Sequence, residues 1–574
     1  MVLDQTEFKQ KAEEKKMSMS KNIARLAVTA GLTAALSFGG VMAPVTMAFA
    51  EGEANGSVTI TNANGNETNF KGYKIFDANV VKDENGQTLV SNITWANNKV
   101  ETAVTEEIEK IDSNASITTA QDAADWIKTY VRGTDETTSV ESGSAAYKIA
   151  AAVAAVTGLD DSSDYATTSK GAANNLSHGY WLFVTDAATV EGVEAATAPI
   201  FTVVGDEAIN INEKTSIPTV DKEVKEGDNW RKVSDSYIGE EVEYKLTGHV
   251  ASNIATFNKY EYVFQDTLSK GLEVVKDSND AAKGLHVYID NKGKQTEVVQ
   301  DANNGYKVAL GQDKATKKEN LTITFSDLKA VKDKTGAPIK VDANSSVVVT
   351  YKAKLNSDVE YGATGTTNEV KLVYSNNPMS NGTGTSVSTK VTDHVFRLDV
   401  TKVDKDDQTH KLEATFQVKM THEGNKKLTQ EKWLTQEGGL TEEGTNAGKF
   451  KTDKDSGEIY IPGLVAGTYE ITECNTPAGY NTLAPFTITV APTYNDDGSL
   501  KSLGVTSSDT EMVTPRTTND ATIPVTIQNK KGSGLPLTGL NGVTFTWIAG
   551  GAVLCIGVAH LIRSRKQAEE SEQE

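Results

Sequence analysis

The sequence has few of the residues on which enzyme chemistry and disulfide cross-linking depend. It contains only two cysteines and seven histidines among 574 residues. Cys555 falls in a C-terminal apolar run, so Cys474 stands alone in the rest of the chain and no internal disulfide can form there. We expect Cys474 to be a small buried residue. The sequence has no Ser/His/Asp, Cys/His or metal-spaced cluster, which argues against a secreted enzyme and against any cofactor or metal.

Positive charge is also scarce. The chain has 57 lysines and arginines against 78 aspartates and glutamates, for a net charge of −21. An acidic surface repels phosphate groups, which argues against nucleic acid and anionic membranes as partners. Such a surface suits a soluble extracellular polymer. The length predicts about three domains.

Long apolar runs are confined to the two ends of the chain. Near the N-terminus, Lys21 and Arg25 precede an apolar stretch that ends in Ala48-Phe49-Ala50. A basic segment, an apolar segment and a small-residue cleavage site make up a signal peptide, so we expect residues 1–50 to be one. Residues 1–16 are polar, and they are either an extension of the signal or an overcalled start.

The C-terminal apolar run extends from Val543 to Ile562 and is followed by a basic tail. At about 1.5 Å per residue it is just long enough to cross a bilayer core of about 30 Å. The pentapeptide Leu535-Pro536-Leu537-Thr538-Gly539 stands before it, after a flexible Gly-Ser-Gly linker. We therefore predict that residues 532–574 form an anchoring segment. The alternative is an ordinary membrane anchor with a chance LPLTG.

This order resembles the cell-wall sorting signal of Gram-positive surface proteins, which begins with Leu-Pro-any-Thr-Gly. The resemblance implies that a sortase transpeptidase cleaves after Thr538 and passes its carbonyl group to an amine. Leu535, Pro536 and Gly539 complete the motif that the sortase recognises. It also implies a secreted protein that is anchored to the peptidoglycan of the cell wall.

Between these two ends the chain divides into three parts. Residues 51–215 mix strand patterns with two helical segments, one capped by Thr119 and one rich in alanine, and this predicts an α+β N-terminal domain. Short strands separated by turn-rich segments then predict two β-sandwiches, over residues 216–393 and 394–531. The predicted fold class is mainly β, with tandem Ig-like sandwiches behind an α+β domain.

Three polar residues of the third part are predicted to face its core. Alternation along residues 398–402 places Lys402 on the same face as the apolar residues before it. The same two-residue alternation predicts that Glu473 and Asn529 also face inward. A buried lysine is costly unless it is paired or neutral. A solvated strand end is the alternative for each residue alone, but three inward polar residues together favour a shared role.

These segments resemble the Cna-B-type domains of Gram-positive surface proteins. The resemblance is carried by residues 398–402, 469–480 and 525–529. The middle stretch is also similar to the E-box of pilin subunits, with Cys474 where threonine is usual. The resemblance implies a spontaneous isopeptide bond between Lys402 and Asn529, with Glu473 as the assisting acid.

The second part repeats this arrangement. Lys222 shares a strand face with two valines, whereas Lys225 falls on the other face. With Asp266 and Asn368, this part resembles the fimbrial isopeptide-forming domain of backbone pilins. The resemblance implies a bond between Lys222 and Asn368 that Asp266 assists. Alternatives are a turn-initiating aspartate for Asp266 and ordinary strand positions for the other two.

A polymer also needs an acceptor amine on each subunit. In backbone pilins this lysine lies at the end of the N-terminal domain, often within Tyr-Pro-Lys, a motif that this chain lacks. At the equivalent place Lys214 stands in a polar segment before Pro218. We name Lys214 as the candidate that attacks the acyl-enzyme formed at Thr538 of the next subunit.

Together the resemblances imply the major shaft subunit of a sortase-assembled pilus that supports adhesion. Its partners would be identical subunits, ancillary pilins, peptidoglycan, and the pilus-type and housekeeping sortases. It would be a sortase substrate, not an enzyme. The alternative is a monomeric wall-anchored adhesin that binds host surface ligands through its N-terminal domain.

Overall fold

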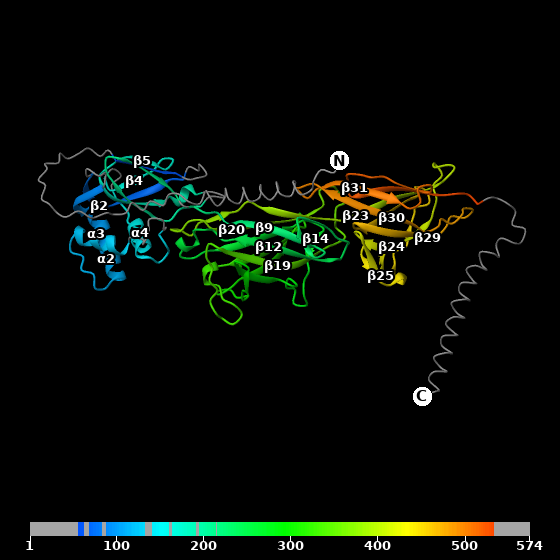
Figure 1. Ribbon diagram of the computed structural model, residues 1–574, viewed down its shortest axis with the longest axis horizontal. Coiled ribbons are helices and arrows are strands. Elements are labelled where there is room, and N and C mark those ends of the chain that lie inside the picture. Colours follow the sequence, from blue (N-terminus) through cyan, green and yellow to red (C-terminus); the bar gives the residue numbers. More distant parts are fainter. Residues whose placement is uncertain are drawn as a thin grey trace, which may run out of the picture.

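The structure is a computed structural model that describes residues 56–61, 68–82, 88–131, 140–159, 163–190, 195–213 and 215–532. Lys214, the predicted signal peptide, the pentapeptide and the predicted membrane segment lie outside the described residues. Three groups of elements follow one another along the long axis of the molecule, and the labelled α-helices belong to the first (Figure 1). Within the described ranges, no helix is long and apolar enough to cross a membrane.

The first group packs three α-helices against a sheet. The helices are α2 (Asn98–Ile111), α3 (Ala120–Tyr130) and α4 (Ala145–Ala154). The sheet has the order β3-β2-β6-β7, with β4 on β2, and comprises β2 (Phe70–Lys82), β3 (Thr88–Trp95), β4 (Tyr165–Thr167), β6 (Gly179–Thr185) and β7 (Ile200–Val204). A second sheet, β5-β1-β8, contains β1 (Gly56–Thr61), β5 (Ala172–Leu176) and β8 (Ala208–Asn212).

The helices begin at side chains that cap them. Thr119 accepts a hydrogen bond from the Asp122 backbone, and the Asp122 side chain accepts one in return from the Thr119 backbone, which is a capping box. Helix α2 was missed by the sequence prediction. Its signal was available, because Asn97 caps it and three buried residues recur at helical spacing, namely Val100, Val104 and Ile108.

The second group is a sandwich of two seven-stranded sheets that enclose one core. The first sheet has the order β10-β9-β12-β19-β15-β16, with β14 on β19. Its strands are β9 (Thr219–Glu226), β10 (Asn229–Arg231), β12 (Glu241–His249), β14 (Leu272–Val274), β15 (His286–Asn291), β16 (Lys294–Glu297) and β19 (Ser345–Leu355).

The facing sheet has the order β11-β22-β20-β13-β18-β17, with β21 on β20. Its strands are β11 (Val233–Asp235), β13 (Tyr262–Leu268), β17 (Lys307–Gln312), β18 (Glu319–Phe325), β20 (Thr366–Ser375), β21 (Thr383–Thr385) and β22 (Thr389–His394). Strands β13 and β20 are antiparallel neighbours, and this pairing brings their inward side chains together.

The third group is a smaller sandwich of a four-stranded and a seven-stranded sheet. The first, β28-β23-β33-β32, contains β23 (Phe396–Asp404), β28 (Glu458–Leu464), β32 (Val513–Pro515) and β33 (Thr522–Asn529). The second, β26-β25-β24-β29-β30-β31 with β27 on β24, contains β24 (Thr415–Glu423), β25 (Lys426–Leu434), β26 (Leu440–Thr441), β27 (Phe450–Lys451), β29 (Gly467–Asn475), β30 (Phe486–Tyr494) and β31 (Leu500–Ser507).

The prediction of a mainly β chain with sandwiches behind a helix-containing first part is confirmed for the described residues. The prediction that Cys474 is buried is wrong, because this cysteine is exposed. On β29 the neighbouring Glu473 occupies the inward position, so strand alternation turns Cys474 outward.

Candidate functional site

Lys222, Asp266 and Asn368 meet between the two sheets of the middle sandwich. Lys222 extends from β9 in one sheet, and the other two extend from the paired strands β13 and β20 of the facing sheet. The exposed fractions are 0%, 1% and 1% in that order. The turn-initiating alternative for Asp266 is wrong, because this residue lies inside β13.

A fourth side chain, Tyr351 of β19, joins this cluster. The Lys222 amine forms an ion pair with Asp266 Oδ1 and donates a hydrogen bond of 3.2 Å to the Tyr351 hydroxyl. That hydroxyl donates to Asp266 Oδ2 at 2.6 Å and accepts from Asn368 Nδ2 at 2.7 Å. The Asn368 carbonyl oxygen is buried and has no hydrogen-bond partner among the described residues.

The surroundings of Lys222 make its amine easier to deprotonate. Burial lowers the pKa of Lys222 from 10.5 to about 8, and this effect outweighs the opposing attraction of Asp266. With that pKa, about a tenth of the amine is neutral at pH 7. A neutral amine is a nucleophile, whereas the ammonium ion is not.

Lys402, Glu473 and Asn529 meet in the C-terminal sandwich. Lys402 lies on β23 and Asn529 on β33, two parallel neighbours of the four-stranded sheet, while Glu473 lies on β29 of the facing sheet. Their exposed fractions are 0%, 5% and 0% for the lysine, glutamate and asparagine. The inward positions predicted for all three residues are therefore confirmed.

Hydrogen bonds hold Asn529 against Glu473. The Asn529 amide nitrogen donates to Glu473 Oε2 at 3.0 Å and to the Asn481 carbonyl at 2.7 Å. Glu473 Oε2 also accepts from the Leu483 backbone at 2.9 Å and from the Thr476 hydroxyl at 3.1 Å. These contacts fix the carboxylate beside the carboxamide.

The lysine of this cluster is poorly satisfied. Lys402 Nζ lies 3.7 Å from Glu473 Oε1, which is an ion-pair distance and too long for a hydrogen bond. Lys402 Nζ, Glu473 Oε1 and Asn529 Oδ1 are all buried without a hydrogen-bond partner among the described residues. Burial lowers the pKa of Lys402 to about 8, against the opposing effect of Glu473. Unpaired buried polar atoms cost free energy, so three in one place point to chemistry rather than to stability.

Each cluster therefore holds an amine, a carboxamide and a carboxyl group in a water-poor core. A neutral lysine amine can attack the carboxamide carbon of an asparagine, and a neighbouring carboxyl group can transfer the protons. The product would be an amide bond, with ammonia as the leaving group. No described group of three His, Cys, Asp or Glu residues could hold a metal ion.

Sequence reasoning missed the groups that orient these residues. Tyr351 follows two buried valines in the alternating pattern of β19 and so resembles an ordinary core residue. In the C-terminal sandwich, the Tyr480 hydroxyl donates to Asp404 Oδ2 at 2.8 Å, and Lys531 Nζ lies 2.9 Å from the same oxygen. The segment after Glu473 is thus tied to the ends of β23 and β33. Tyr480 lies in the E-box-like stretch, and it was the one feature of the sequence that could have pointed to this contact.

A third buried lysine lies in the N-terminal group. Lys74 is 2% exposed, forms an ion pair with Asp77 and donates a hydrogen bond of 2.6 Å to the Ser177 hydroxyl. Its amine thus contacts a carboxylate and a hydroxyl, whereas Lys222 and Lys402 each lie in a cluster that includes an asparagine. The described contacts of Lys74 give no support for a cross-link there.

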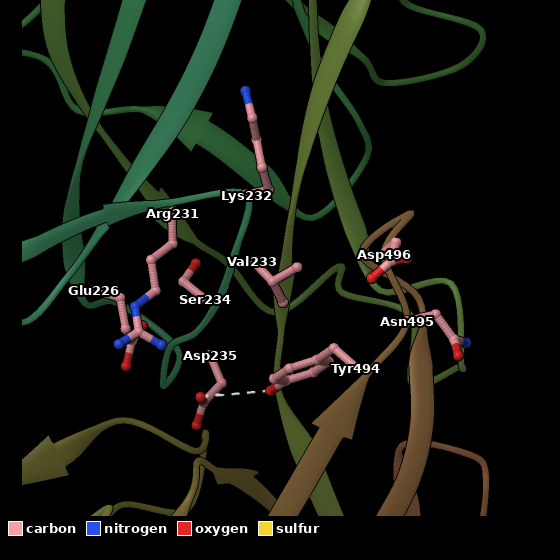
Figure 2. A pocket seen from close by; sticks show the side chains of 9 residues that line it. All are labelled: Glu226, Arg231, Lys232, Val233, Ser234, Asp235, Tyr494, Asn495 and Asp496. Carbon is pink, nitrogen blue, oxygen red and sulfur yellow. Dashed lines mark hydrogen bonds between the residues drawn. The ribbon is translucent and has the colours of Figure 1, made fainter. Parts of the chain in front are cut away.

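A pocket of about 270 Å³ lies between the middle and C-terminal sandwiches (Figure 2). Its lining residues are Glu226, Arg231, Lys232, Val233, Ser234, Asp235, Tyr494, Asn495 and Asp496. The Tyr494 hydroxyl donates to Asp235 Oδ1 at 3.5 Å, and Asp235 Oδ2 accepts from the Ala466 backbone. These bonds join the two sandwiches, and none of the predicted site residues lines the pocket.

Solved structures of pilins resemble this chain. The T6 backbone pilin of Streptococcus pyogenes serotype M6 shares 16% identity over 83% of this chain and 98% of its own, with a TM-score of 0.44. The major pilin SpaA of Corynebacterium diphtheriae shares 13% identity over 83% of this chain and 100% of its own, with a TM-score of 0.42. The pilus 2b backbone protein of group B streptococcus shares 22% identity over 56% of this chain and 99% of its own, with a TM-score of 0.38.

No curated protein matches this chain in sequence. One family model does match part of it. The matched segment begins with β23, ends inside β31, and includes Lys402 and Glu473 but not Asn529. Residues 396–502 match the family described as the SpaA prealbumin-like fold domain.

Proposed function

We propose that this chain is the shaft subunit of a covalently polymerised pilus on the surface of a Gram-positive cell. The observation that carries the proposal is the pair of buried lysine–acid–asparagine clusters in two successive sandwiches. Lys222 and Asn368 would be joined in the first, and Lys402 and Asn529 in the second. The protein would act as a structural subunit and a sortase substrate, not as an enzyme.

Each bond would form once, within one chain. The lysine Nζ–asparagine Cγ bond forms, the Cγ–Nδ2 bond breaks, and one proton moves from Nζ to Nδ2, which leaves as ammonia. Lowered lysine pKa values make the neutral amine available, as both clusters require. Asp266 and Glu473 would accept the lysine proton and return it to the leaving group.

The positions of the clusters suit a fibre under tension. If a sortase joins Thr538 of one subunit to Lys214 of the next, force enters each subunit a few residues before Lys222. It would then cross to Asn368, follow the chain to Lys402, and cross again to Asn529. Residues between each pair of linked side chains would carry no tension, because amide bonds do not yield to pulling as folded strands do.

The same route bypasses the N-terminal group, because Lys214 follows its last strand, β8. A domain outside the tension path needs no cross-link, which agrees with the contacts of Lys74. That domain would be free to vary its surface or to bind partners such as ancillary pilins.

An immunoblot of wall extracts boiled in SDS tests the proposed function. We expect a ladder of high-mass species in cells that express the protein, and its loss in a sortase deletion. Lys214→Ala should remove the ladder and leave a wall-anchored monomer. Lys225→Ala, at another lysine near the start of the middle sandwich, is the matched control and should leave the ladder intact.

One outcome would count against the proposed function, and another would count against Lys214 as the acceptor. A single band released by wall hydrolase in the unmodified strain would support a monomeric wall-anchored adhesin instead. A ladder that persists in the Lys214→Ala strain would show that another lysine is the acceptor.

A further inference from the structure

We propose that Tyr351 is a catalytic residue for the bond between Lys222 and Asn368, and that its hydroxyl carries a proton between the two reacting nitrogens. This inference rests on the proposed function, because it assumes that the bond forms. It assigns a role to a residue that neither the sequence pattern nor the three-residue cluster required.

The position of the hydroxyl is the main observation. Its oxygen lies 3.2 Å from Lys222 Nζ, the nucleophile, and 2.7 Å from Asn368 Nδ2, the leaving group. Its hydrogen is directed to Asp266 Oδ2, which is 2.6 Å away. One oxygen therefore contacts both nitrogens between which the proton must move, and it also contacts the acid.

The C-terminal cluster shows why a fourth group is needed. There the carboxylate of Glu473 contacts the leaving nitrogen directly, at 3.0 Å. Asp266 is shorter by one methylene group, and among the described hydrogen bonds its link to Asn368 runs through Tyr351. The tyrosine hydroxyl supplies the reach that the shorter acid lacks.

The protein holds this hydroxyl in place and keeps it protonated. Tyr351 is completely buried, and its ring stacks on that of Tyr244 with centroids 5.6 Å apart. Burial, aided by the charge of Asp266, raises the pKa of Tyr351 well above 10. The group is therefore a neutral phenol at physiological pH, and it can accept one proton and release another without carrying a charge.

The proton balance is complete without any outside reagent. As Lys222 Nζ bonds to the Asn368 carbon, its proton passes to the Tyr351 oxygen, either directly or through Asp266. Tyr351 gives its own proton to Asn368 Nδ2, the carbon–nitrogen bond breaks, and ammonia leaves. Tyr351 ends as it began, and the net proton transfer is from the amine to the leaving group.

The test is the rate of bond formation in the full chain made by in vitro translation. Samples are quenched at intervals and analysed by peptide mass mapping for the Lys222–Asn368 and Lys402–Asn529 linked pairs. In Tyr351→Phe we expect the first bond to form at least about tenfold more slowly, since one proton-transfer group is lost. The second bond, in the same molecules, should form at the unmodified rate.

Tyr244→Phe is the matched control. It also removes a buried hydroxyl from this core, but that hydroxyl donates to Asp393, at 3.5 Å. We expect no change in rate. A circular-dichroism melt of each purified variant separates slow chemistry from a failure to fold.

A rescue experiment gives a result that a purely structural role would not produce. Asp266→Glu in the Tyr351→Phe background provides the longer acid that the C-terminal cluster uses, and it should restore most of the rate. A Tyr351→Phe protein that reacts at the unmodified rate, or a double variant that stays as slow as the single one, would overturn the role of Tyr351. Absence of the bond in the unmodified protein would instead overturn the proposed function.

Discussion

The middle and C-terminal sandwiches bring the same kinds of side chain together by different routes. In the middle sandwich, lysine comes from one sheet, and the acid and asparagine come from neighbouring strands of the other. In the C-terminal sandwich, lysine and asparagine lie on neighbouring strands of one sheet, and the acid comes from the other. The proposed chemistry would therefore depend on the meeting of three groups and not on one strand order.

The difference changes what each proposed bond would hold. A Lys222–Asn368 bond would cross the core and fasten one sheet to the other. A Lys402–Asn529 bond would join two parallel strands that are already paired along their length. The first would resist separation of the sheets and the second would resist sliding of the strands, yet both would carry tension from the start of a sandwich to its end.

The largest expected effect is the length of chain that mechanical stretching releases when one of the two bonds is removed. When the unmodified chain is pulled between residues 215 and 532, residues 222–368 and 402–529 should not extend. Lys222→Ala should release roughly 500 Å of chain from the middle sandwich, and Lys402→Ala roughly 450 Å from the C-terminal one. Single-molecule force spectroscopy measures these lengths, with Cys474→Ser as the background because that thiol is exposed. Release of either of these lengths from the unmodified chain would contradict the proposed bonds.

Removal of the acids should slow bond formation by about 10²- to 10⁴-fold, the usual contribution of a general acid–base group. Asp266→Asn should affect only the bond of the middle sandwich, and Glu473→Gln only that of the C-terminal one. Peptide mass mapping follows both bonds in one sample, so each is the control for the other. Bond formation at the unmodified rate in Glu473→Gln would remove the assisting role from that residue.

The rates of both reactions should depend on pH in the same way. The pKa values of Lys222 and Lys402 are both lowered to about 8 by burial, and only the neutral amine reacts. Raising the pH through 8 deprotonates each amine, so each rate should rise about tenfold between pH 7 and 9. Timed quenching of freshly made protein at each pH gives the rates. A profile that is flat over this range would contradict the lowered pKa values.

The smallest expected effect concerns the junction between the sandwiches. Burial raises the pKa of Glu226 to about 7, of Asp235 to about 6, of Glu240 to about 8 and of Asp393 to about 7. Folding then favours the protonated acids, so stability should rise as the pH falls from 8 towards 5 and decline again as the pH is raised. We expect a gain of roughly 2–4 °C in melting temperature by calorimetry. Asp393→Asn should reduce this gain.

The sequence was sufficient to predict the inward direction of polar residues that interrupt an alternating apolar pattern along a strand. Lys402, Glu473 and Asn529 break an alternating apolar pattern, so period two alone turns them inward. Tyr351 does not break the pattern of β19, because tyrosine is a common core residue, and only its three-dimensional neighbours distinguish it. The α2 helix was missed although the sequence shows both its capping asparagine and the helical spacing of its apolar residues. The prediction for Cys474 was wrong because Glu473 already takes the inward position, and strand alternation turns the next residue outward.

The assignment of strands to particular sheets could not be predicted from the sequence. Nothing in residues 219–226 or 366–375 says that these two strands belong to opposite sheets. Sheet order is set by long-range pairing, and a similar set of residues gives a different order in the C-terminal sandwich.

The mass of the folded protein shows most directly whether the two proposed isopeptide bonds have formed. We expect residues 51–532, expressed alone, to weigh less than their sequence by the mass of two ammonia molecules. Asn368→Ala and Asn529→Ala should each restore one of them, and the linked peptides should contain Lys222 with Asn368 and Lys402 with Asn529. A protein of full sequence mass, with all four residues in unlinked peptides, would show that neither bond forms.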